Sequence, residues 1–191
     1  MCAASGAIDH VWLEGGNIRY SIIGGGEAVG ICGSGLIDAV AVALELGLIN
    51  KRGRILDESR IIPITEQIFL TQDDIRQVQL AKGAICAGIR LMMQKLNLQS
   101  EDISKVMLAG AFGSFLNPAS ACRIGLLPSE LQNRIEAVGN AAGSGAKLLC
   151  TRRDTLSLTD ELVKEIEYLE LASLPAFPKT FAKAMEFPYF D

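Results

Sequence analysis

The 191 residues are 49% apolar and carry a formal net charge of −4, with 18 Lys and Arg against 22 Asp and Glu. This composition is typical of a globular chain that buries a sizeable core. The acidic balance, without a cluster of Lys and Arg, argues against a nucleic-acid partner. No apolar stretch reaches the roughly 18 residues of a membrane span, and no signal segment follows Met1, so we expect a cytoplasmic protein without a membrane partner.

The five cysteines stand too far apart to form a C-x-x-C pair. They are Cys2, Cys32, Cys86, Cys122 and Cys150. This spacing encodes neither a zinc knuckle nor an iron–sulfur loop, so buried thiols are expected. The sequence also offers no convincing set of metal ligands.

Two antiparallel strands are predicted near the N-terminus. Residues 7–13 and 18–23 are rich in Ile and Val, and the glycines between them can supply the positive φ of a hairpin turn. The chain enters this pattern almost at once after a few small residues. We therefore expect the sequence to be a fragment of a longer protein.

The next segments predict helices and a surface excursion. Apolar spacing within residues 36–44 predicts a helix that begins near Ser34 and ends near Gly47. A short strand is expected at 60–64, inside a polar surface segment. Thr71 and Asp74 resemble a capping box, and the apolar face that follows predicts a long helix reaching Leu96.

Two glycines interrupt the predicted long helix. Each of Gly83 and Gly88 costs about 1 kcal/mol relative to Ala in a helix interior. Because other small residues lie beside them, this part of the helix is expected to pack closely against a neighbouring segment.

The second half alternates strands and helices. Strands are predicted at 105–109 and 135–138, and helices after Asn117, at 141–150 and from 157 to about 174. The aromatic tail, residues 177–190, should pack on the domain. The whole order predicts an α/β fold with a mixed sheet, antiparallel at the hairpin and parallel where helices cross over.

Three turns consist almost entirely of small residues: 30–35, 109–114 and 139–145. Each precedes a helix, whose N-terminus carries unpaired N–H groups and partial positive charge. Such turns can bind a phosphate or the flat face of a nucleotide. They can also simply let helices pack closely, but three of them in one small sheet favour a ligand. The Walker and G-x-G-x-x-G patterns are both absent.

The polar residues do not define a catalytic site. His10 is the only histidine, and its position in a strand indicates packing or a hydrogen bond. Asp38, Asp73 and Asp74 are expected in first turns of helices or on exposed faces, where a carboxylate favours the helix dipole. The catalytic residues therefore remain unassigned.

Six segments in order resemble a known family over nearly the whole chain: GICGSGLIDAV (30–40), LTQDDIRQVQLAKGAICAGI (70–89), LAGAFGSFLNP (108–118), RIGLLP (123–128), VGNAAGSGA (138–146) and the final EFP. They look like the C-terminal region of the ATP-dependent reductive activators of corrinoid proteins. That family belongs to the actin-like ATPase superfamily, with acetate and sugar kinases, chaperone ATPases and actin. The resemblance implies a ribonuclease H-like lobe with a mixed sheet flanked by helices.

The resemblance also implies a function. Such activators use ATP, with Mg, to return Co(II) corrinoid to Co(I) for methyl transfer, and they carry a 2Fe–2S cluster in an N-terminal domain. This chain would be a single C-terminal lobe, 1–191, with residues 155–191 as a helical and aromatic extension. The cluster domain and the first lobe would lie outside it, so neither electron transfer nor hydrolysis is expected of this chain alone.

The resemblance places eight residues near the nucleotide: Gly110, Ala111, Gly113 and Ser114 against the base or ribose, Gly33, Ser34 and Gly35 at the first helix, and Asn140 beside a polar edge. The LAGAFG segment matches the adenosine segment of the superfamily, which normally has a Gly-Gly pair. Ala111 stands where the second glycine is usual, which leaves less room for the nucleotide.

The implied partner is a corrinoid protein or a corrinoid methyltransferase. The aromatic tail further suggests a homodimer. One alternative is an activator or kinase of the same superfamily. The other is a non-catalytic docking or dimerisation module, in which the small-residue turns only pack helices and no nucleotide binds.

Overall fold

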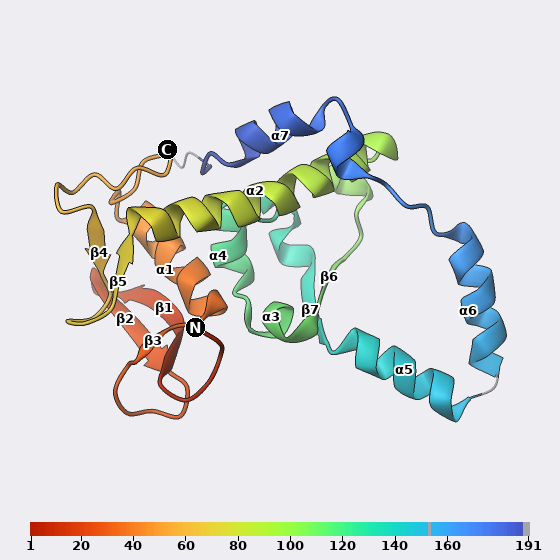
Figure 1. The fold of residues 1–191 in the computed structure, drawn as a ribbon, viewed down its shortest axis with the longest axis horizontal. Coiled ribbons are helices and arrows are strands. Elements are labelled where there is room, and N and C mark those ends of the chain that lie inside the picture. Colours follow the sequence, from red (N-terminus) through yellow and green to blue (C-terminus); the bar gives the residue numbers. More distant parts are fainter. Residues whose placement is uncertain (153, 189–191) are drawn as a thin grey trace.

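The computed structural model describes residues 1–152 and 154–188. The helices and strands, shown in Figure 1, are β1 (Ala7–Glu14), β2 (Asn17–Ile22), β3 (Gly30–Ile31), α1 (Gly33–Glu45), β4 (Ile61–Pro63), β5 (Phe69–Thr71), α2 (Gln72–Lys95), β6 (Val106–Ala109), α3 (Gly110–Phe115), α4 (Pro118–Arg123), β7 (Ile135–Gly139), α5 (Ala141–Thr151), α6 (Asp154–Glu165) and α7 (Phe177–Ala184). Helices and strands alternate along much of the chain, as the α/β prediction requires.

The N-terminal sheet is mixed, with the strand order β2-β1-β3. β1 pairs with β2 antiparallel and with the short β3 parallel, so the predicted hairpin and the mixed sheet are both confirmed. Gly15 and Gly16 turn the hairpin with φ of 59° and 80°, a region that glycine occupies without steric cost. α1 follows directly and packs against β1.

The main core lies between this sheet and the helices behind it. It joins side chains from β1, α1, α2, the end of α4 and the C-terminal tail, among them Ile8, Val40, Ile75, Ile124 and Phe187. Each of these five side chains is at most 4% exposed. Residues from both ends of the chain therefore share one core.

The start of α2 confirms the predicted capping box. The backbone N–H of Asp74 donates to Thr71 Oγ1 over 3.2 Å, and the Thr71 N–H donates to Asp74 Oδ2 over 2.8 Å. The residues just before this cap also form β5, which pairs antiparallel with β4. β4 confirms the strand expected at 60–64, whereas β5 was not expected.

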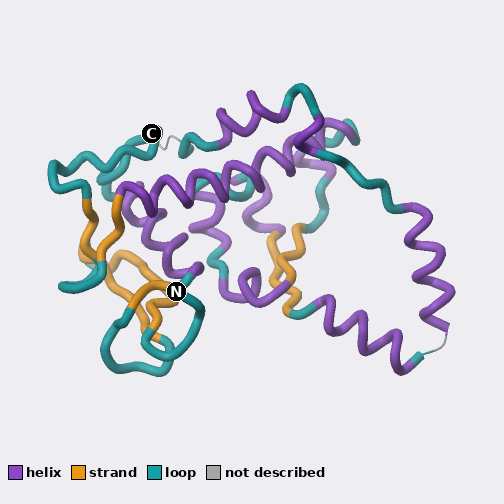
Figure 2. The backbone as a smooth tube through the Cα atoms, in the orientation of Figure 1, coloured by secondary structure: helices purple, strands orange, loops and turns teal. Residues whose placement is uncertain are grey.

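β6 and β7 form a separate parallel sheet. Figure 2 shows this pair of strands apart from the N-terminal sheet, on the other side of α1. The expectation that all three small-residue turns belong to one sheet is therefore wrong. The turns after β6 and β7 share a sheet, and the turn before α1 belongs to the N-terminal sheet.

α5 and α6 form an arm that projects from the rest of the molecule (Figure 1). Neither helix contains a buried residue. α6 ends at Glu165, so the helix predicted to continue to residue 174 is wrong beyond that point. The chain is instead extended through Glu167 and forms a short 3₁₀ helix at Leu171–Ser173. An ion pair of 2.9 Å between Lys95 and Glu167 connects this segment to the end of α2.

The C-terminal tail packs on α2, as predicted (Figure 1). A Cβ on Gly83 would lie 3.0 Å from Met185 Cγ, and a Cβ on Gly88 would lie 3.2 Å from Leu171 Cδ1. Gly83 and Gly88 thus allow the tail to lie close to α2, as the energetic cost of two glycines inside a helix had suggested. The rings of Phe177 and Phe181 stack, with their centroids 5.7 Å apart. The tail residues 189–191 lie outside the described residues.

Three of the five cysteines are buried, as expected for thiols in the core. These are Cys32, Cys86 and Cys122, whereas Cys2 and Cys150 are exposed, so the expectation of a buried thiol is wrong for those two. Across the described ranges, no group of three or more His, Cys, Asp or Glu side chains is placed to hold a metal ion. Nor does any described helix combine the length and the apolar character that crossing a membrane requires.

Candidate functional site

Two of the predicted turns meet at the carboxyl ends of β6 and β7. These strands are parallel, and Ala109 pairs with Gly139, so Gly110 and Asn140 follow at the same edge. Gly110 has φ of 86° and Gly139 has φ of 64°, and a Cβ on either would meet no atom within 4 Å. The glycines are required by backbone conformation, and the space above them is open.

The turn after β6 is itself helical. α3 begins at Gly110, earlier than the helix predicted after Asn117, which is the separate α4. Ala111 is exposed on this helix, and the Ser114 hydroxyl donates to the Gly110 carbonyl over 3.0 Å. Both residues therefore lie at the surface beside the open edge.

Gly113 lies on the opposite, buried side of α3. A Cβ there would approach the Leu108 carbonyl carbon and Cβ to 3.0 Å. Its lack of a side chain is explained by the close packing of α3 on β6. The structure thus separates Gly113 from the exposed neighbours with which the sequence grouped it.

The first helix reaches the site through one residue. A Cβ on Gly33 would lie 2.9 Å from the Phe112 ring, so the start of α1 touches α3. Ser34 is buried and its hydroxyl donates to the Asp9 carbonyl over 2.9 Å. A Cβ on Gly35 would meet the Ile8 carbonyl oxygen at 2.5 Å. Ser34 and Gly35 therefore hold α1 on β1, and Gly33 alone borders the open edge.

Asn140 is the N-cap of α5. Its side-chain Oδ1 accepts a hydrogen bond from the Gly143 N–H over 2.8 Å, which leaves the amide Nδ2 without a partner among the described residues. The residue is exposed. Its free amide group can donate to a polar edge of a ligand, and its cap fixes where that group stands.

The local electrostatics favour an anion. The first turns of α1, α3 and α5 contain no acidic residue, and the N-caps of α1 and α3 make no side-chain hydrogen bond. The N–H groups at these two helix starts therefore keep their positive partial charge uncompensated. With the open strand ends, this arrangement can hold a polar, negatively charged ligand such as a nucleotide.

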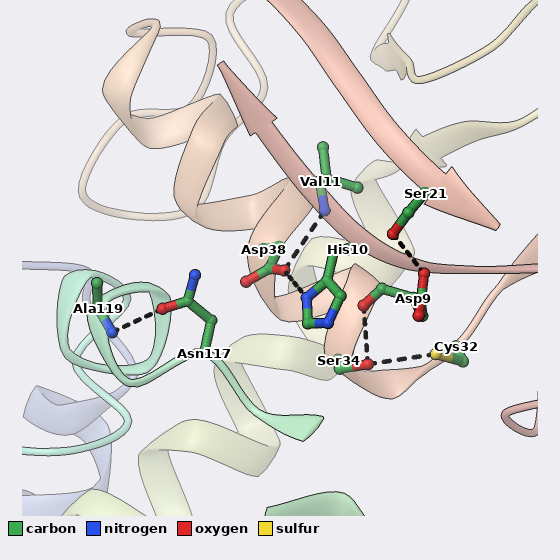
Figure 3. A network of polar contacts seen from close by, with 9 residues as sticks. All are labelled: Asp9, His10, Val11, Ser21, Cys32, Ser34, Asp38, Asn117 and Ala119. Carbon is green, nitrogen blue, oxygen red and sulfur yellow. Dashed lines mark hydrogen bonds and ion pairs between the residues drawn. The ribbon is translucent and has the colours of Figure 1, made fainter. Parts of the chain in front are cut away.

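A buried carboxylate near this site was missed. Asp38 is 1% exposed, which corrects the expectation of an exposed or dipole-facing role. Its Oδ2 lies 3.1 Å from His10 Nδ1 and accepts from the Val11 N–H over 3.4 Å, as Figure 3 shows. The hydrogen bond expected of His10 is thereby confirmed. Asp38 Oδ1 has no partner within the described residues.

The sequence did carry one signal for this pair. Asp38 stands one helical turn after Ser34, on the face that α1 turns toward β1, and that face is otherwise apolar or small. A carboxylate in such a stripe must be paired, and His10 is the only histidine available. What the sequence could not show was which residue of β1 lies opposite.

The sequence around this site matches a known protein family over its whole length. The model of the family described as "C-terminal domain of RACo the ASKHA domain" matches residues 1–191. The chain belongs to this family. ASKHA denotes the acetate and sugar kinase, heat-shock and actin superfamily, so the actin-like fold class is confirmed.

Similar proteins carry related names. The corrinoid activation enzyme RamQ of Eubacterium limosum is 33% identical over 207 residues, covering 95% of this chain and 35% of RamQ. The [Co(II) methylated amine-specific corrinoid protein] reductase of Methanosarcina barkeri is 31% identical over 155 residues, covering 80% of this chain and 28% of the reductase.

A solved structure has the same fold. The reductive activator for corrinoid, iron–sulfur protein superposes with a TM-score of 0.85 at 34% identity, covering 100% of this chain and 34% of that one. The chain thus spans about a third of the length of the proteins it resembles.

Proposed function

We propose that this chain is the nucleotide-binding lobe of an ATP-dependent activator that reduces Co(II) corrinoid to Co(I) and so reactivates a corrinoid-dependent methyltransferase system. Membership of the ASKHA family supports the nucleotide, and the names of the relatives support the corrinoid partner. ATP binding would favour closure of this lobe on a second lobe, and that closure would couple the nucleotide to the uphill reduction.

The open edge above Gly110 and Gly139 carries this proposal. Both residues need positive φ, neither has an atom in the way of a Cβ, and the exposed Ala111 and Asn140 border the same edge. Packing explains Gly35 and Gly113, whereas positive φ explains Gly110 and Gly139. A ligand that lies flat over the strand ends would occupy the open space above these two glycines.

The side chains that the structure describes do not fit the metal groups of the proposed reaction. Because the described residues offer no cluster of metal ligands, Mg would be held chiefly by the phosphates of ATP. The buried Cys32, Cys86 and Cys122 form no such cluster either. The electrons would therefore come from a 2Fe–2S cluster in a region outside these 191 residues.

Two further features belong to the proposal. The activator would act in the cytoplasm, because the corrinoid methyltransferase system it serves is expected there. It would also form a homodimer. The tail aromatics were expected to provide that contact. Phe187 is 3% exposed and belongs to the core, whereas Phe177 and Phe181 are partly exposed beside α2 and could contribute to it.

The alternative docking module is favoured by one observation, the arm. Exposed apolar side chains gather on α6 and the segment after it: Leu156, Leu158, Leu162, Val163, Ile166 and Tyr168. A protein whose small-residue turns only pack helices could use this arm as its working surface. Such a module would bind a partner without binding ATP.

Calorimetric titration with Mg-ATP and Mg-ADP tests the nucleotide site. Ala111→Leu is the informative substitution, because Ala111 is exposed and helical, so bulk there obstructs the open edge without straining the fold. We expect the wild-type chain to bind both nucleotides and the variant to bind at least tenfold more weakly, about 1.4 kcal/mol. Ala84→Leu, at an exposed position of α2, is the matched control and should bind normally.

Equal binding by wild type and Ala111→Leu would contradict the site. If the wild-type chain bound neither nucleotide, the same substitution would be made at the equivalent position of the full-length E. limosum relative. Loss of binding there would show a half-site that needs its second lobe. Unchanged binding there would leave the docking module as the better explanation.

A further inference from the structure

A cavity of about 490 Å³ lies between the C-terminal half of α2 and the segment from Cys122 to Glu130. Pro188 of the tail closes part of its wall. None of the residues at the candidate nucleotide site lines it. Its volume falls within the range of small-molecule sites, about 300 to 1,000 Å³. It is therefore a second, separate place where a ligand fits.

One wall of the cavity presents an unused positive charge. Arg90 of α2 is exposed, lines the cavity, and has no hydrogen bond or ion pair with any residue that the structure describes. A guanidinium group can bind a carboxylate with two parallel hydrogen bonds. Gln94, one turn further along the same helix, also lines the cavity, and its side-chain amide has no hydrogen-bond partner among the described residues. This wall is suited to an anionic group.

The floor is apolar and holds two buried thiols. Cys86 and Cys122 approach from α2 and α4, beside Met93 and Leu127. Cys122 Sγ donates a weak hydrogen bond of 3.6 Å to the Pro128 carbonyl. These groups can cover the hydrocarbon part of a ligand but cannot satisfy a second charge.

One acidic residue also lines the cavity. Glu130 lines the cavity, and burial followed by this carboxylate raises the pKa of the Cys122 thiol. Burial also lowers the pKa of Lys82, one turn before Cys86, to about 8. Displaced pKa values gather at functional sites more often than elsewhere. Within the cavity, Arg90 attracts an anionic group and Glu130 repels one.

We propose that this cavity binds a small molecule with one anionic group on an apolar body, the anionic group pairing with Arg90 and the body lying over Cys86 and Cys122. The pairing supplies orientation, and the burial of the apolar body supplies most of the affinity. Carboxylates and sulfonates share this chemistry, and both can therefore serve as probes.

The probe is 8-anilinonaphthalene-1-sulfonate, titrated by fluorescence against the folded 191-residue chain, with octanoate as the competitor. We expect one site, displacement by octanoate, and at least fivefold weaker binding in Arg90→Gln. Ser129→Trp adds bulk at an exposed position of the rim and should reduce binding by at least tenfold. Glu130→Gln should bind about twofold to threefold more tightly. Arg54→Gln, at another exposed arginine, is the matched control.

Equal affinities for Arg90→Gln and Arg54→Gln would overturn the proposal, as would binding at several equivalent sites. Loss of the near-ultraviolet circular dichroism during the titration would also overturn it, because the probe would then report unfolding. Displacement by Mg-ATP would show that the cavity is not a separate site. The nucleotide titration with Arg90→Gln should remain unchanged, so either proposal can fail without the other.

Discussion

The side-chain amine of Lys82 lies 5.0 Å from the centroid of the Phe187 ring, and the same amine donates a hydrogen bond to the Glu186 carbonyl. Lys82 is 1% exposed, so this cation is shielded from water. One turn earlier, Gln79 Nε2 donates to the Met185 carbonyl over 3.0 Å. Two polar side chains of α2 thus fasten the tail that completes the core.

The buried amine makes stability depend on pH. The pKa of Lys82 is lowered to about 8 by burial and by Arg90, against the opposing effects of Cys86 and Glu186. Between pH 8 and 10.5 the unfolded chain binds more protons at this residue than the folded one. The Lys82 contribution to the free energy of unfolding should therefore rise with pH there, by up to roughly 2 to 3 kcal/mol.

Lys82→Met isolates this effect. Methionine keeps the length of the side chain and its contact with Phe187 but cannot titrate. Urea unfolding of both proteins is measured at pH 7 and pH 10. Between these two pH values the free energy of unfolding should rise less in the variant than in the wild-type protein. Because the Cys and Tyr side chains titrate in both proteins, their contribution cancels in the difference. A gain of the same size in both proteins would show that Lys82 has its ordinary pKa.

The pair formed by His10 and Asp38 should respond asymmetrically to substitution. Asp38 is buried, whereas the His10 side chain is 40% exposed. His10→Ala leaves the buried Asp38 carboxyl group without its side-chain hydrogen-bond partner and should lower the free energy of unfolding by about 2 to 3 kcal/mol at pH 7. Asp38→Ala leaves a histidine that water can solvate and should cost about 1 kcal/mol less. Chemical denaturation of the two variants measures this.

The double variant of His10 and Asp38 serves as the internal control. It should be more stable than His10→Ala alone, because it also removes the stranded carboxylate. If the double variant were the least stable of the three, the carboxylate would not be the source of the cost.

The two glycines of α2 that face the tail should differ. A Cβ on Gly88 meets only the tip of the flexible Leu171 side chain, so Gly88→Ala should stabilise the protein by about 0.5 to 1 kcal/mol through helix propensity. A Cβ on Gly83 approaches the Met185 backbone N at 3.3 Å. Gly83→Leu should therefore displace the tail and expose α7 to limited proteolysis. Equal protease resistance in both variants would contradict this packing.

Alanine substitutions of the two glycines at the start of α1 should differ in their effect on stability, because only Gly35 packs against backbone atoms. Gly35→Ala drives a Cβ against the Ile8 carbonyl oxygen and should cost more than about 2 kcal/mol in thermal unfolding. Gly33→Ala meets only the half-exposed Phe112 ring, which can move, so its cost should stay below about 1 kcal/mol. A reversed order would mean that α1 does not rest on β1 as described.

The sequence predicted the elements that carry local signals. Thr71 and Asp74 are three residues apart and cap their own helix, so a short window contains all the information that is needed. The break after Glu165 was missed, because Leu158, Leu162 and Ile166 keep helical spacing across it without a Gly or Pro to end the helix. α6 has no buried residue, so its apolar side chains are not buried against a neighbouring segment of the described chain. Their helical spacing alone therefore gave a wrong end for the helix.

The candidate site was predictable only as a set of small residues. A small residue in the sequence indicates that another group lies close to the backbone at that position. It does not indicate whether that group is another part of the protein or a ligand. Gly35 faces the Ile8 backbone and Gly113 faces Leu108, whereas Gly110 faces open space. Only the three-dimensional arrangement distinguishes these cases. For the same reason, the partner of Asp38 lay 28 residues away on another element and could not be assigned from spacing.

The hydrogen bond of 2.8 Å from the Phe187 N–H to the Lys51 carbonyl has a consequence for biosynthesis. The ribosome makes the hairpin, α1 and the loop around Lys51 well before the tail, so the core beneath them lacks the Phe187 ring until the tail has been synthesised. During that interval the nascent lobe must keep an apolar surface exposed. A chain that stopped before Phe187 would keep that surface exposed, and would be a natural substrate for chaperones and proteases.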